Sequence, residues 1–435
     1  MKNSTLKITG GKPLIGEVHV RGAKNAIPKI MVAALLSKET SVIHNVANVV
    51  DVGIVTKMIE LLGGEVINDG KGTIEIRAKH LKPVGPDELH RVAGTSRIPI
   101  LFAGPLLHRA GKAVLPELGG CEIGTRPVDF HLQALKTLGA TEHDVEGGYE
   151  LTTTGLRGAK IELDYPSVMA TEQVLLSAVL AEGVTELRGA AVEPEIIDLI
   201  CVLLKMGAII SVDTDRVILI TGVKQLHGFE HQVLPDRIET GSWACAAAAT
   251  NGRIFVRGAR QADMMAFLNA FRLIGCEYQV ADDGIEFWRG KSTQPISLET
   301  DVHPGFMTDW QQPFTVLLTQ IDGLSTVHET VYEDRFGFTQ TLNAMGARIQ
   351  LYQNCLGKLP CRFVQKNYQH SAVIMGQTKL HAREMMVPDL RAGFSYVIAA
   401  LVADGTTSIS NIGLIERGYE NFEAKLQAIG ALIDK

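Results

Sequence analysis

The chain has 435 residues, of which 46% are hydrophobic and 21% charged, and its formal net charge is −6. This length exceeds the usual size of one hydrophobic core and predicts two domains of about 200 residues each. The composition excludes a disordered or fibrous protein, and the net charge gives no overall attraction to nucleic acid or anionic lipid.

The N-terminal segment leads into a strand-like pattern and lacks the apolar core of a secretory signal. The longest apolar stretches, such as residues 394–403, fall well short of the roughly 18 residues that span a bilayer. We therefore expect a cytoplasmic protein that binds no membrane. The six cysteines include no CxxC pair, and no GxxxxGKS or HExxH pattern occurs, so we expect no cofactor and no metal.

One pattern recurs along the chain: a helix that ends in an apolar residue, a glycine and a small residue, followed by a strand. Its copies are centred on Gly63, Gly139, Gly207, Gly275, Gly346 and Gly430. Glycine at a helix C-terminus adopts the left-handed conformation without steric cost. The spacing of roughly 70 to 85 residues suits a small α/β unit, so six units in two domains imply three units per domain.

The segment 119–129 (GGCEIGTRPVD) carries the clearest chemical signal. Glycines flank Cys121, and Arg126 can favour its thiolate or bind an anion. Pro127 suits the first turn of the following helix, whose N-terminus also attracts anions. From these residues alone, an inert thiol in a turn is about equally consistent.

This segment, together with residues 22–26 (GAKNA) and 389–392 (DLRA), resembles the UDP-N-acetylglucosamine enolpyruvyl transferase family of the EPSP synthase-like superfamily. Residues 234–241 (LPDRIETG) and 417–420 (RGYE) are further matches, and the likeness runs from about Leu14 to the C-terminus. The resemblance implies an α/β fold of two inside-out α/β barrel domains, each of three repeated units. It places one domain at 23–234, the other at 1–22 and 235–435, and the active site between them.

The activity implied by the resemblance is transfer of the enolpyruvyl group of phosphoenolpyruvate to the 3-hydroxyl of UDP-N-acetylglucosamine, with release of phosphate. This is the first committed step of peptidoglycan precursor synthesis. In this family pattern Asp309 would accept the proton of the hydroxyl, and Cys121 would protonate the methylene carbon. Lys24 and Arg417 complete the expected catalytic set. Both substrates are small molecules, and no nucleic acid partner is expected.

Phosphoenolpyruvate carries a phosphate and a carboxylate on a small skeleton, so its site needs several fixed cations. By the resemblance these are Lys24, Arg97, Arg126, Arg335, Arg391 and Arg417. The nucleotide sugar would contact Asn25, Arg97, Arg126, Pro127, Val128, Asp129, Phe130, Ser167, Val168, Asp309 and Val331. Any one arginine is more often a surface ion-pair partner, but six cations at matched motifs favour an anion site.

The chain departs from the family pattern at two positions, and these departures leave the identity of the acceptor substrate undecided. Met169 stands where the family usually has glycine, and Gln173 stands where asparagine is common. A side chain at 169 could shift the diphosphate, so a different nucleotide acceptor is one alternative. A nucleotide-sugar-binding paralogue without catalysis is another, although Cys121 and Asp309 argue against it. The cysteine segment argues against a shikimate-pathway acceptor, and the acidic charge argues against an RNA-end-processing protein.

Overall fold

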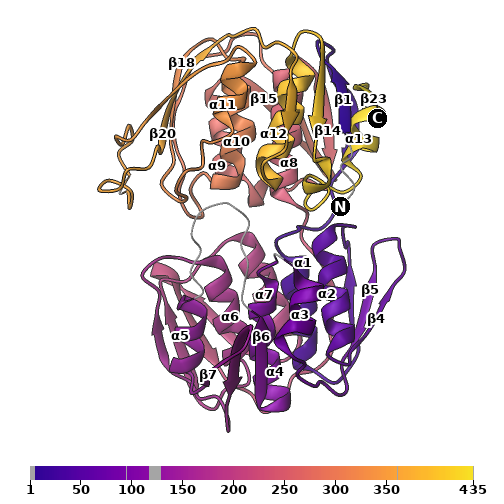
Figure 1. Ribbon diagram of the computed structural model, residues 1–435, viewed down its shortest axis with the longest axis vertical. Coiled ribbons are helices and arrows are strands. Elements are labelled where there is room, and N and C mark those ends of the chain that lie inside the picture. The colour runs from indigo at the N-terminus through magenta and orange to yellow at the C-terminus, as the bar shows by residue number, and fades with distance from the viewer. Residues whose placement is uncertain (1–4, 95, 117–128, 360, 435) are drawn as a thin grey trace. The chain divides into compact units, whose positions relative to one another are not determined.

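The computed structural model describes residues 5–94, 96–116, 129–359 and 361–434 (Figure 1). Within these limits the chain forms two compact units. Unit 1 consists of residues 5–21 and 235–434, and unit 2 of residues 22–234. The N-terminal strands therefore belong to the same unit as the C-terminal half of the chain.

Unit 2 contains three consecutive segments in which helices alternate with strands. The first has α1 (Ile27–Ala33), η1 (Ala34–Leu36), β3 (Ser41–His44), α2 (Val50–Leu61), β4 (Glu65–Asn68) and β5 (Ile74–Arg77). The second has α3 (Pro86–Ala93), η2 (Ile98–Phe102), α4 (Ala103–Ala110), β6 (Lys112–Pro116), α5 (Asp129–Thr137), β7 (Thr141–Val145) and β8 (Gly148–Thr152). The third has β9 (Lys160–Glu162), α6 (Val168–Ala178), β10 (Val184–Arg188), α7 (Pro194–Lys205), β11 (Ile209–Asp213), η3 (Thr214–Arg216) and β12 (Val217–Thr221), and β13 (Glu230–Gln232) follows it.

Unit 1 repeats the same alternation, with two strands supplied by the N-terminus. These are β1 (Thr5–Thr9) and β2 (Ile15–His19). The first segment has α8 (Arg237–Ala249), β14 (Arg253–Arg257), η4 (Gln261–Asp263), α9 (Met265–Leu273), β15 (Cys276–Ala281) and β16 (Gly284–Arg289). The second has β17 (Ser297–Glu299), α10 (Thr308–Leu318), β18 (Gly323–His328), α11 (Thr339–Ala344), β19 (Arg348–Tyr352) and β20 (Ser371–Gly376). The third has β21 (Glu384–Met386), α12 (Leu390–Val402), β22 (Thr406–Ser410), η5 (Ile412–Leu414), α13 (Phe422–Ala428) and β23 (Leu432–Asp434).

Each segment contributes one small sheet. The strand orders among the described residues are β13-β3-β5-β4, β6-β8-β7 and β11-β12-β10-β9 in unit 2, and β15-β16-β14-β2, β17-β18-β20-β19 and β21-β22-β1-β23 in unit 1. Every four-stranded sheet has one parallel edge pair and otherwise antiparallel pairs. Strand β13 closes the first sheet of unit 2 from the far end of that unit, and β2 closes a sheet of unit 1 from the N-terminus.

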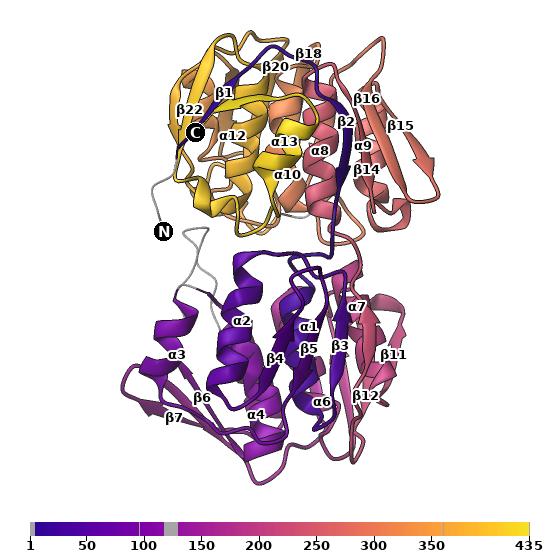
Figure 2. The same ribbon diagram turned by 90° about the vertical axis from the view of Figure 1, so that its right-hand side faces the viewer.

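In unit 1 the helices α8, α10 and α12 lie inside the sheets (Figures 1 and 2), and in unit 2 the residues of α1 and most of those of α6 are buried. Every residue of α8 is buried, and its run of small residues lets α10 approach closely. At Gly241, an added Cβ would lie 2.7 Å from Cδ1 of Trp310. The predicted α/β fold of six repeated units in two inside-out barrels is therefore confirmed. Among the described helices, none combines the length and apolar character required to cross a bilayer.

The glycine that marks each repeat stops a helix, as the sequence pattern predicts. The φ angles of Gly63, Gly139, Gly207, Gly275, Gly346 and Gly430 are +95°, +101°, +98°, +82°, +110° and +92°. Other residues rarely adopt this left-handed region. The glycines therefore let the chain leave each helix and enter the next strand.

We expect Gly139→Ala to destabilise the protein by about 1–2 kcal/mol, because alanine is strained at positive φ. Space is not limiting, since the nearest atom to an added Cβ is 3.9 Å away. The matched control is Gly53→Ala in α2, where no atom lies within 4 Å and φ is not positive. It should stabilise by about 0.5–1 kcal/mol. Urea unfolding of both variants checks this, and equal shifts of the same sign would contradict it.

Candidate active site

The first turns of three buried helices meet in unit 1. Asp236 caps α8 by accepting hydrogen bonds from backbone N–H groups at 2.8 and 3.0 Å, and Asp389 caps α12 at the same distances. Trp310, in the first turn of α10, donates to the carbonyl of Arg237, the first residue of α8, at 3.0 Å. Helix N-termini carry partial positive charge, so this end of unit 1 favours anions.

Asp309 lies between two buried arginines at this end. Nη2 of Arg335 donates to Oδ1 of Asp309 at 2.9 Å, and Nε of Arg391 lies 3.6 Å from Oδ2. The two arginines are only 3% and 5% exposed. Among the described residues, Nε of Arg335 and Nη1 of Arg391 nevertheless find no hydrogen-bond partner. Buried guanidinium donors that lack acceptors are suited to hold a carboxylate or phosphate.

The electrostatics keep Arg391 charged. Burial disfavours the cation, but the negative charge of Asp309 opposes this effect and helps to raise the pKa of Arg391 above its usual value. Burial also raises the pKa of Tyr419 to about 12, so its phenol stays protonated at neutral pH. The Tyr419 hydroxyl is hydrogen-bonded to Ser242 at 2.9 Å. Arg417 lies two residues earlier, partly buried, in the turn between η5 and α13.

A buried glutamate shapes the turn that carries Val331. The Glu329 carboxylate accepts hydrogen bonds from the hydroxyls of Thr300 and Thr308, each at 2.9 Å. It also accepts the backbone N–H groups of Val331 at 2.9 Å and Tyr332 at 3.0 Å. Burial raises the pKa of Glu329. Because Tyr332 presents its ring 5.2 Å from the guanidinium of Arg335, the same turn supports that arginine.

Unit 2 places its predicted residues at helix N-termini in the same way. Lys24 and Asn25 lie in the turn before α1, and Arg97 is the residue that precedes η2. Ser167 caps α6, its hydroxyl accepting the N–H of Ala170 at 3.4 Å, and Val168 is the first residue of that helix. Since α1, η2 and α6 pack together, the structure brings these predicted residues to one end of unit 2.

Two ion pairs hold the turn before α1. Nζ of Lys24 lies 2.8 Å from the buried carboxylate of Asp51. Nζ of Lys29 lies 3.5 Å from Glu172 and donates to the backbone carbonyl of Asn25 at 2.5 Å. Lys24 keeps 19% of its side chain exposed, so it can reach a ligand from this support.

The buried pair of Lys29 and Glu172 makes the free energy of unfolding depend on pH. Burial raises the pKa of Glu172 to about 7, and Lys29 opposes the shift. The folded state therefore holds this proton more tightly than the unfolded state, whose carboxyl titrates near 4.5. The contribution of Glu172 to the free energy of unfolding is therefore fully present below about pH 4.5, and it is lost as the pH rises through 7.

We expect the difference in unfolding free energy between the wild type and Glu172→Gln to change by about 3 kcal/mol from pH 4.5 to 8, with the wild type losing stability. Chemical denaturation across this range measures it. A difference that does not vary with pH would contradict the assignment.

Arg97 also acts on the start of α5. Burial, followed by the charge of Arg97, lowers the pKa of His131 to about 4. The exposed Asp129 and the partly buried Phe130 precede His131 in the first turn of α5.

Four predicted residues lie outside the described residues: Cys121, Arg126, Pro127 and Val128. Their roles stay predictions. Several supporting residues were not predicted, namely Asp51, Glu172, Ser242, Glu329 and Tyr419. No short pattern signals a buried carboxylate that pairs across the fold, although Tyr419 lies within the matched segment 417–420.

The two departures from the family pattern have structural explanations. The Met169 side chain packs against the hydrophobic core of unit 2, as does that of Val168. Gln173 is fully buried, and its Nε2 donates to the hydroxyl of Ser177 at 3.1 Å within α6. Both side chains thus serve the packing of α6.

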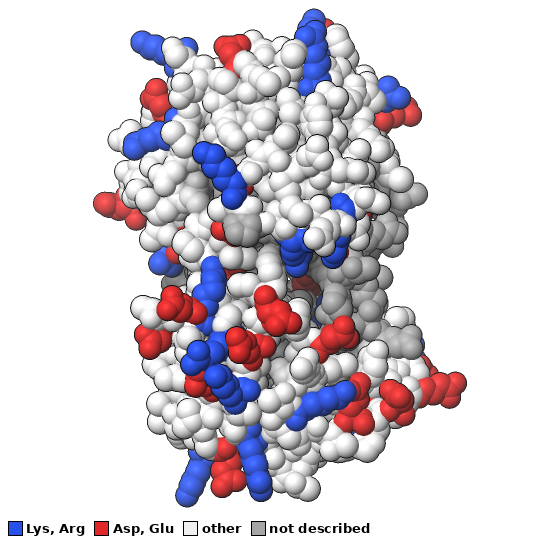
Figure 3. Space-filling view, turned by 90° about the vertical axis from the view of Figure 1, so that its left-hand side faces the viewer, with Lys and Arg blue, Asp and Glu red and all other residues white. Residues whose placement is uncertain are grey.

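The surface charge is mixed. On the face in Figure 3, basic and acidic side chains of the described residues are interspersed over both units rather than gathered by sign. The cations that could hold a small anion are instead the buried or partly buried residues at the helix N-termini.

A family profile described as EPSP synthase (3-phosphoshikimate 1-carboxyvinyltransferase) matches residues 8–426. The chain is 49% identical over 434 residues to the UDP-N-acetylglucosamine 1-carboxyvinyltransferase of Protochlamydia amoebophila, covering 98% of this chain and 93% of that one. It is 45% identical to the protein of that name from Chlamydia trachomatis, covering 98% and 97%. The enzyme of that name from Acinetobacter baylyi is 42% identical, covering 98% of each chain.

Solved structures agree in fold. The enolpyruvyl transferase NikO from Streptomyces tendae superimposes with a TM-score of 0.86 at 22% identity, covering 99% of this chain and 98% of that one. EPSP synthase from Acinetobacter baumannii superimposes with a TM-score of 0.76 at 17% identity, covering 99% and 100%. At these identities the likeness establishes the fold alone.

Proposed function

Because the chain belongs to the UDP-N-acetylglucosamine 1-carboxyvinyltransferases of the EPSP synthase family, we propose that it transfers the enolpyruvyl group of phosphoenolpyruvate to the 3-hydroxyl of UDP-N-acetylglucosamine. Phosphate is the second product. The reaction would be the first committed step of peptidoglycan precursor synthesis, and we propose the cytoplasm as its compartment. Its partners are these two small molecules.

The observation that supports this proposal most strongly is the carboxylate of Asp309 between Arg335 and Arg391. A carboxylate that accepts a proton from an alcohol must be positioned and ionised. The two arginines supply both conditions, and their unpartnered N–H groups suit the carboxylate of phosphoenolpyruvate.

The proposed chemistry proceeds by addition and elimination. The sugar 3-oxygen bonds to the central carbon of phosphoenolpyruvate while Asp309 accepts the hydroxyl proton and the thiol of Cys121 protonates the methylene carbon. The resulting tetrahedral intermediate carries a methyl group and the phosphate. Loss of one methyl proton to the Cys121 thiolate and departure of phosphate, protonated by Asp309, restore the double bond and both residues.

The remaining cations of the proposed site hold charge on the phosphate side. We assign Lys24, Arg126 and Arg417 to the phosphate, with Arg97 close to it. Support for Lys24 comes from its exposed fraction and its fixed position beside Asp51.

The test is phosphate release from phosphoenolpyruvate with UDP-N-acetylglucosamine, UDP-N-acetylgalactosamine or shikimate 3-phosphate, with product masses recorded. Wild type runs beside Cys121→Ser. We expect release only with UDP-N-acetylglucosamine, a product heavier by one enolpyruvyl group, and greatly reduced turnover in the variant. Phosphate release with only a different acceptor would identify that molecule as the substrate instead. No phosphate release with any acceptor would favour a paralogue that binds the nucleotide sugar without catalysis.

A further inference from the structure

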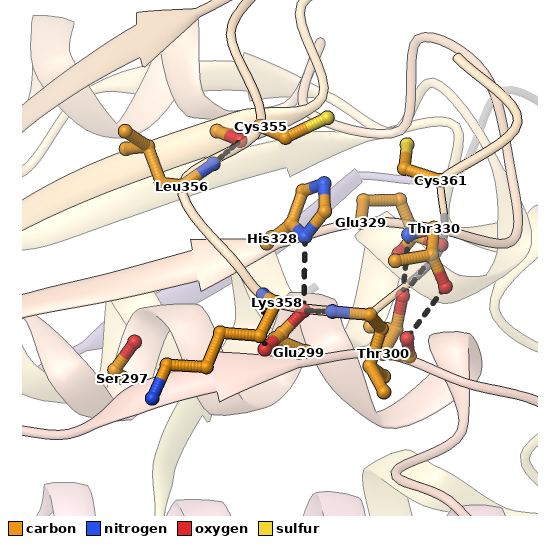
Figure 4. Close-up of polar contacts among 12 residues, drawn as sticks. Ser297, Glu299, Thr300, His328, Glu329, Thr330, Cys355, Leu356, Lys358 and Cys361 are labelled. Atoms are coloured by element: carbon orange, nitrogen blue, oxygen red, sulfur yellow. Dashed lines mark hydrogen bonds and ion pairs between the residues drawn. The ribbon is translucent and has the colours of Figure 1, made fainter. Parts of the chain in front are cut away.

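Four side chains with metal-ligating atoms gather in unit 1, outside the proposed catalytic residues. They are His328, Cys355, Cys361 and His370, and one ligand atom from each lies within 4.8 Å of the others. His328 ends β18, and His370 precedes β20. The two cysteines lie in the segment between β19 and β20, which brings them over the paired strand ends (Figure 4).

Hydrogen bonds orient both imidazoles in the way that metal-bound histidines require. Nδ1 of His370 donates to the carbonyl of Tyr368 at 2.8 Å, which leaves the lone pair on Nε2, 3.3 Å from Sγ of Cys355. Nδ1 of His328 lies 3.2 Å from the Glu299 carboxylate, and its other nitrogen points toward the cysteines in Figure 4. Such carboxylate and carbonyl acceptors fix the tautomer of zinc-bound histidines.

The second nitrogen of His328 is the clearest sign of a missing ligand. His328 is 1% exposed, and its Nε2 has no hydrogen-bond partner among the described residues. Leaving a buried polar nitrogen unpaired is unfavourable, because the nitrogen has lost its contact with water and gained no other partner. A cation at the centre of the cluster would satisfy this nitrogen.

The surrounding loop is organised by the same carboxylate that orients His328. Glu299 accepts the backbone N–H groups of Lys358 and Leu359, each at 2.8 Å. The N–H of Phe363 donates to Sγ of Cys361 at 3.4 Å, which stabilises negative charge on that sulfur. Glu299 therefore supports a histidine and the segment that carries both cysteines.

We propose that His328, Cys355, Cys361 and His370 bind one zinc ion in a structural site. Two thiolates and two neutral imidazoles neutralise Zn²⁺, and four protein ligands leave no open position for catalysis. Zn–S bonds of about 2.3 Å and Zn–N bonds of about 2.0–2.1 Å place tetrahedral ligand atoms roughly 3.3–3.8 Å apart. The 3.3 Å between Cys355 and His370 already fits, and the widest separation must shrink by about 1 Å.

The proposed site departs from the sequence expectation of no metal. That expectation rested on the absence of CxxC, whereas here the cysteines are six positions apart and the histidines come from two strand ends. Pairing of His328 with Ser371 across β18 and β20 brings the two histidines together. This pairing has no signature in a short motif.

Zinc at this position would fix the segment that supports the Val331 turn. Arg362 follows Cys361 and donates to the carbonyl of Val331, and it lies 3.7 Å from Glu333. The metal would therefore act on stability and on the position of this turn, while the reacting atoms lie elsewhere.

The test measures bound metals by mass spectrometry in the full chain, purified without chelator under reducing conditions. We expect about one zinc ion per chain in the wild type. We also expect at least a tenfold loss in Cys355→Ser and in Cys361→Ser, in line with about 10–100-fold effects of changes around zinc sites. The matched control is Cys201→Ser, an exposed cysteine of α7, which should keep its zinc. Circular dichroism verifies that each variant folds.

Exchange of zinc for Co²⁺ provides a second readout. The wild type and Cys201→Ser should show thiolate-to-cobalt charge transfer and the intense visible bands of tetrahedral cobalt, and both disappear in the two other variants. The proposal is overturned by less than about 0.1 zinc per chain even after incubation with ZnCl₂ in reducing buffer. Full zinc in both Cys355→Ser and Cys361→Ser, or a Cys355–Cys361 disulfide in freshly purified protein, would overturn it as well.

Discussion

Asp309→Asn is expected to lower kcat for enolpyruvyl transfer by about 10²–10⁴-fold. Asparagine keeps the shape of the side chain and can still accept the hydrogen bond from Arg335, which is 2.9 Å long in the native pair. It cannot take the proton of the sugar hydroxyl. The loss therefore falls on the chemical step.

Binding of phosphoenolpyruvate should not weaken in this variant. The substitution removes a negative charge that neutralises Arg335 and Arg391, so the two guanidiniums attract the substrate carboxylate at least as strongly. We expect an unchanged or lower KM for phosphoenolpyruvate in steady-state assays. The matched control is Asp322→Asn at an exposed position of unit 1. A kcat within about threefold of wild type would remove Asp309 from the role of base.

Arg391→Lys should lower kcat/KM for phosphoenolpyruvate by about 10²-fold, mainly through KM. Lysine keeps the charge but has one ammonium group, which cannot contact Asp309 and a substrate carboxylate in the fixed geometry of a guanidinium. In the native chain Nε of Arg391 faces Asp309 while Nη1 is buried without a partner. The second contact is the one that we assign to the substrate.

The control for this change is Arg383→Lys, an exposed arginine of unit 1. It should leave kcat/KM unchanged. Thermal unfolding of both variants separates a local loss of binding from a loss of fold, since Arg391 is buried at the first turn of α12. If folded Arg391→Lys kept kcat/KM within about threefold of wild type, Arg391 would not bind the substrate.

The repeat architecture was predictable because the glycines that end its helices can be recognised from the local sequence. Each marked glycine ends a helix within a few residues of the sequence that defines it, and its positive φ follows from that position. The strand pairs that complete each sheet were not predictable from the spacing of hydrophobic residues in the sequence. Strand β2 pairs with β14, and β13 pairs with β3, across long stretches of sequence that no local pattern connects.

The residues of the candidate site also divide into those that local motifs predict and those that they do not. Asp309, Arg335 and Arg391 were predicted from motifs that resemble a family, and the structure shows Asp309 in contact with both arginines. Glu329 and Glu172 were not predicted, because their importance lies in burial and in partners distant along the chain. The cluster of His328, Cys355, Cys361 and His370 was not predicted for the same reason.

Mass analysis of the product formed in D₂O, from phosphoenolpyruvate and UDP-N-acetylglucosamine, tests the proposed activity and its chemistry together. Protonation of the methylene carbon creates a methyl group, which then loses one of its hydrogens when phosphate leaves. The account predicts a product that is heavier by one enolpyruvyl group and carries deuterium on its methylene carbon. Unchanged UDP-N-acetylglucosamine would contradict the proposed transfer, and a product without deuterium would contradict addition and elimination.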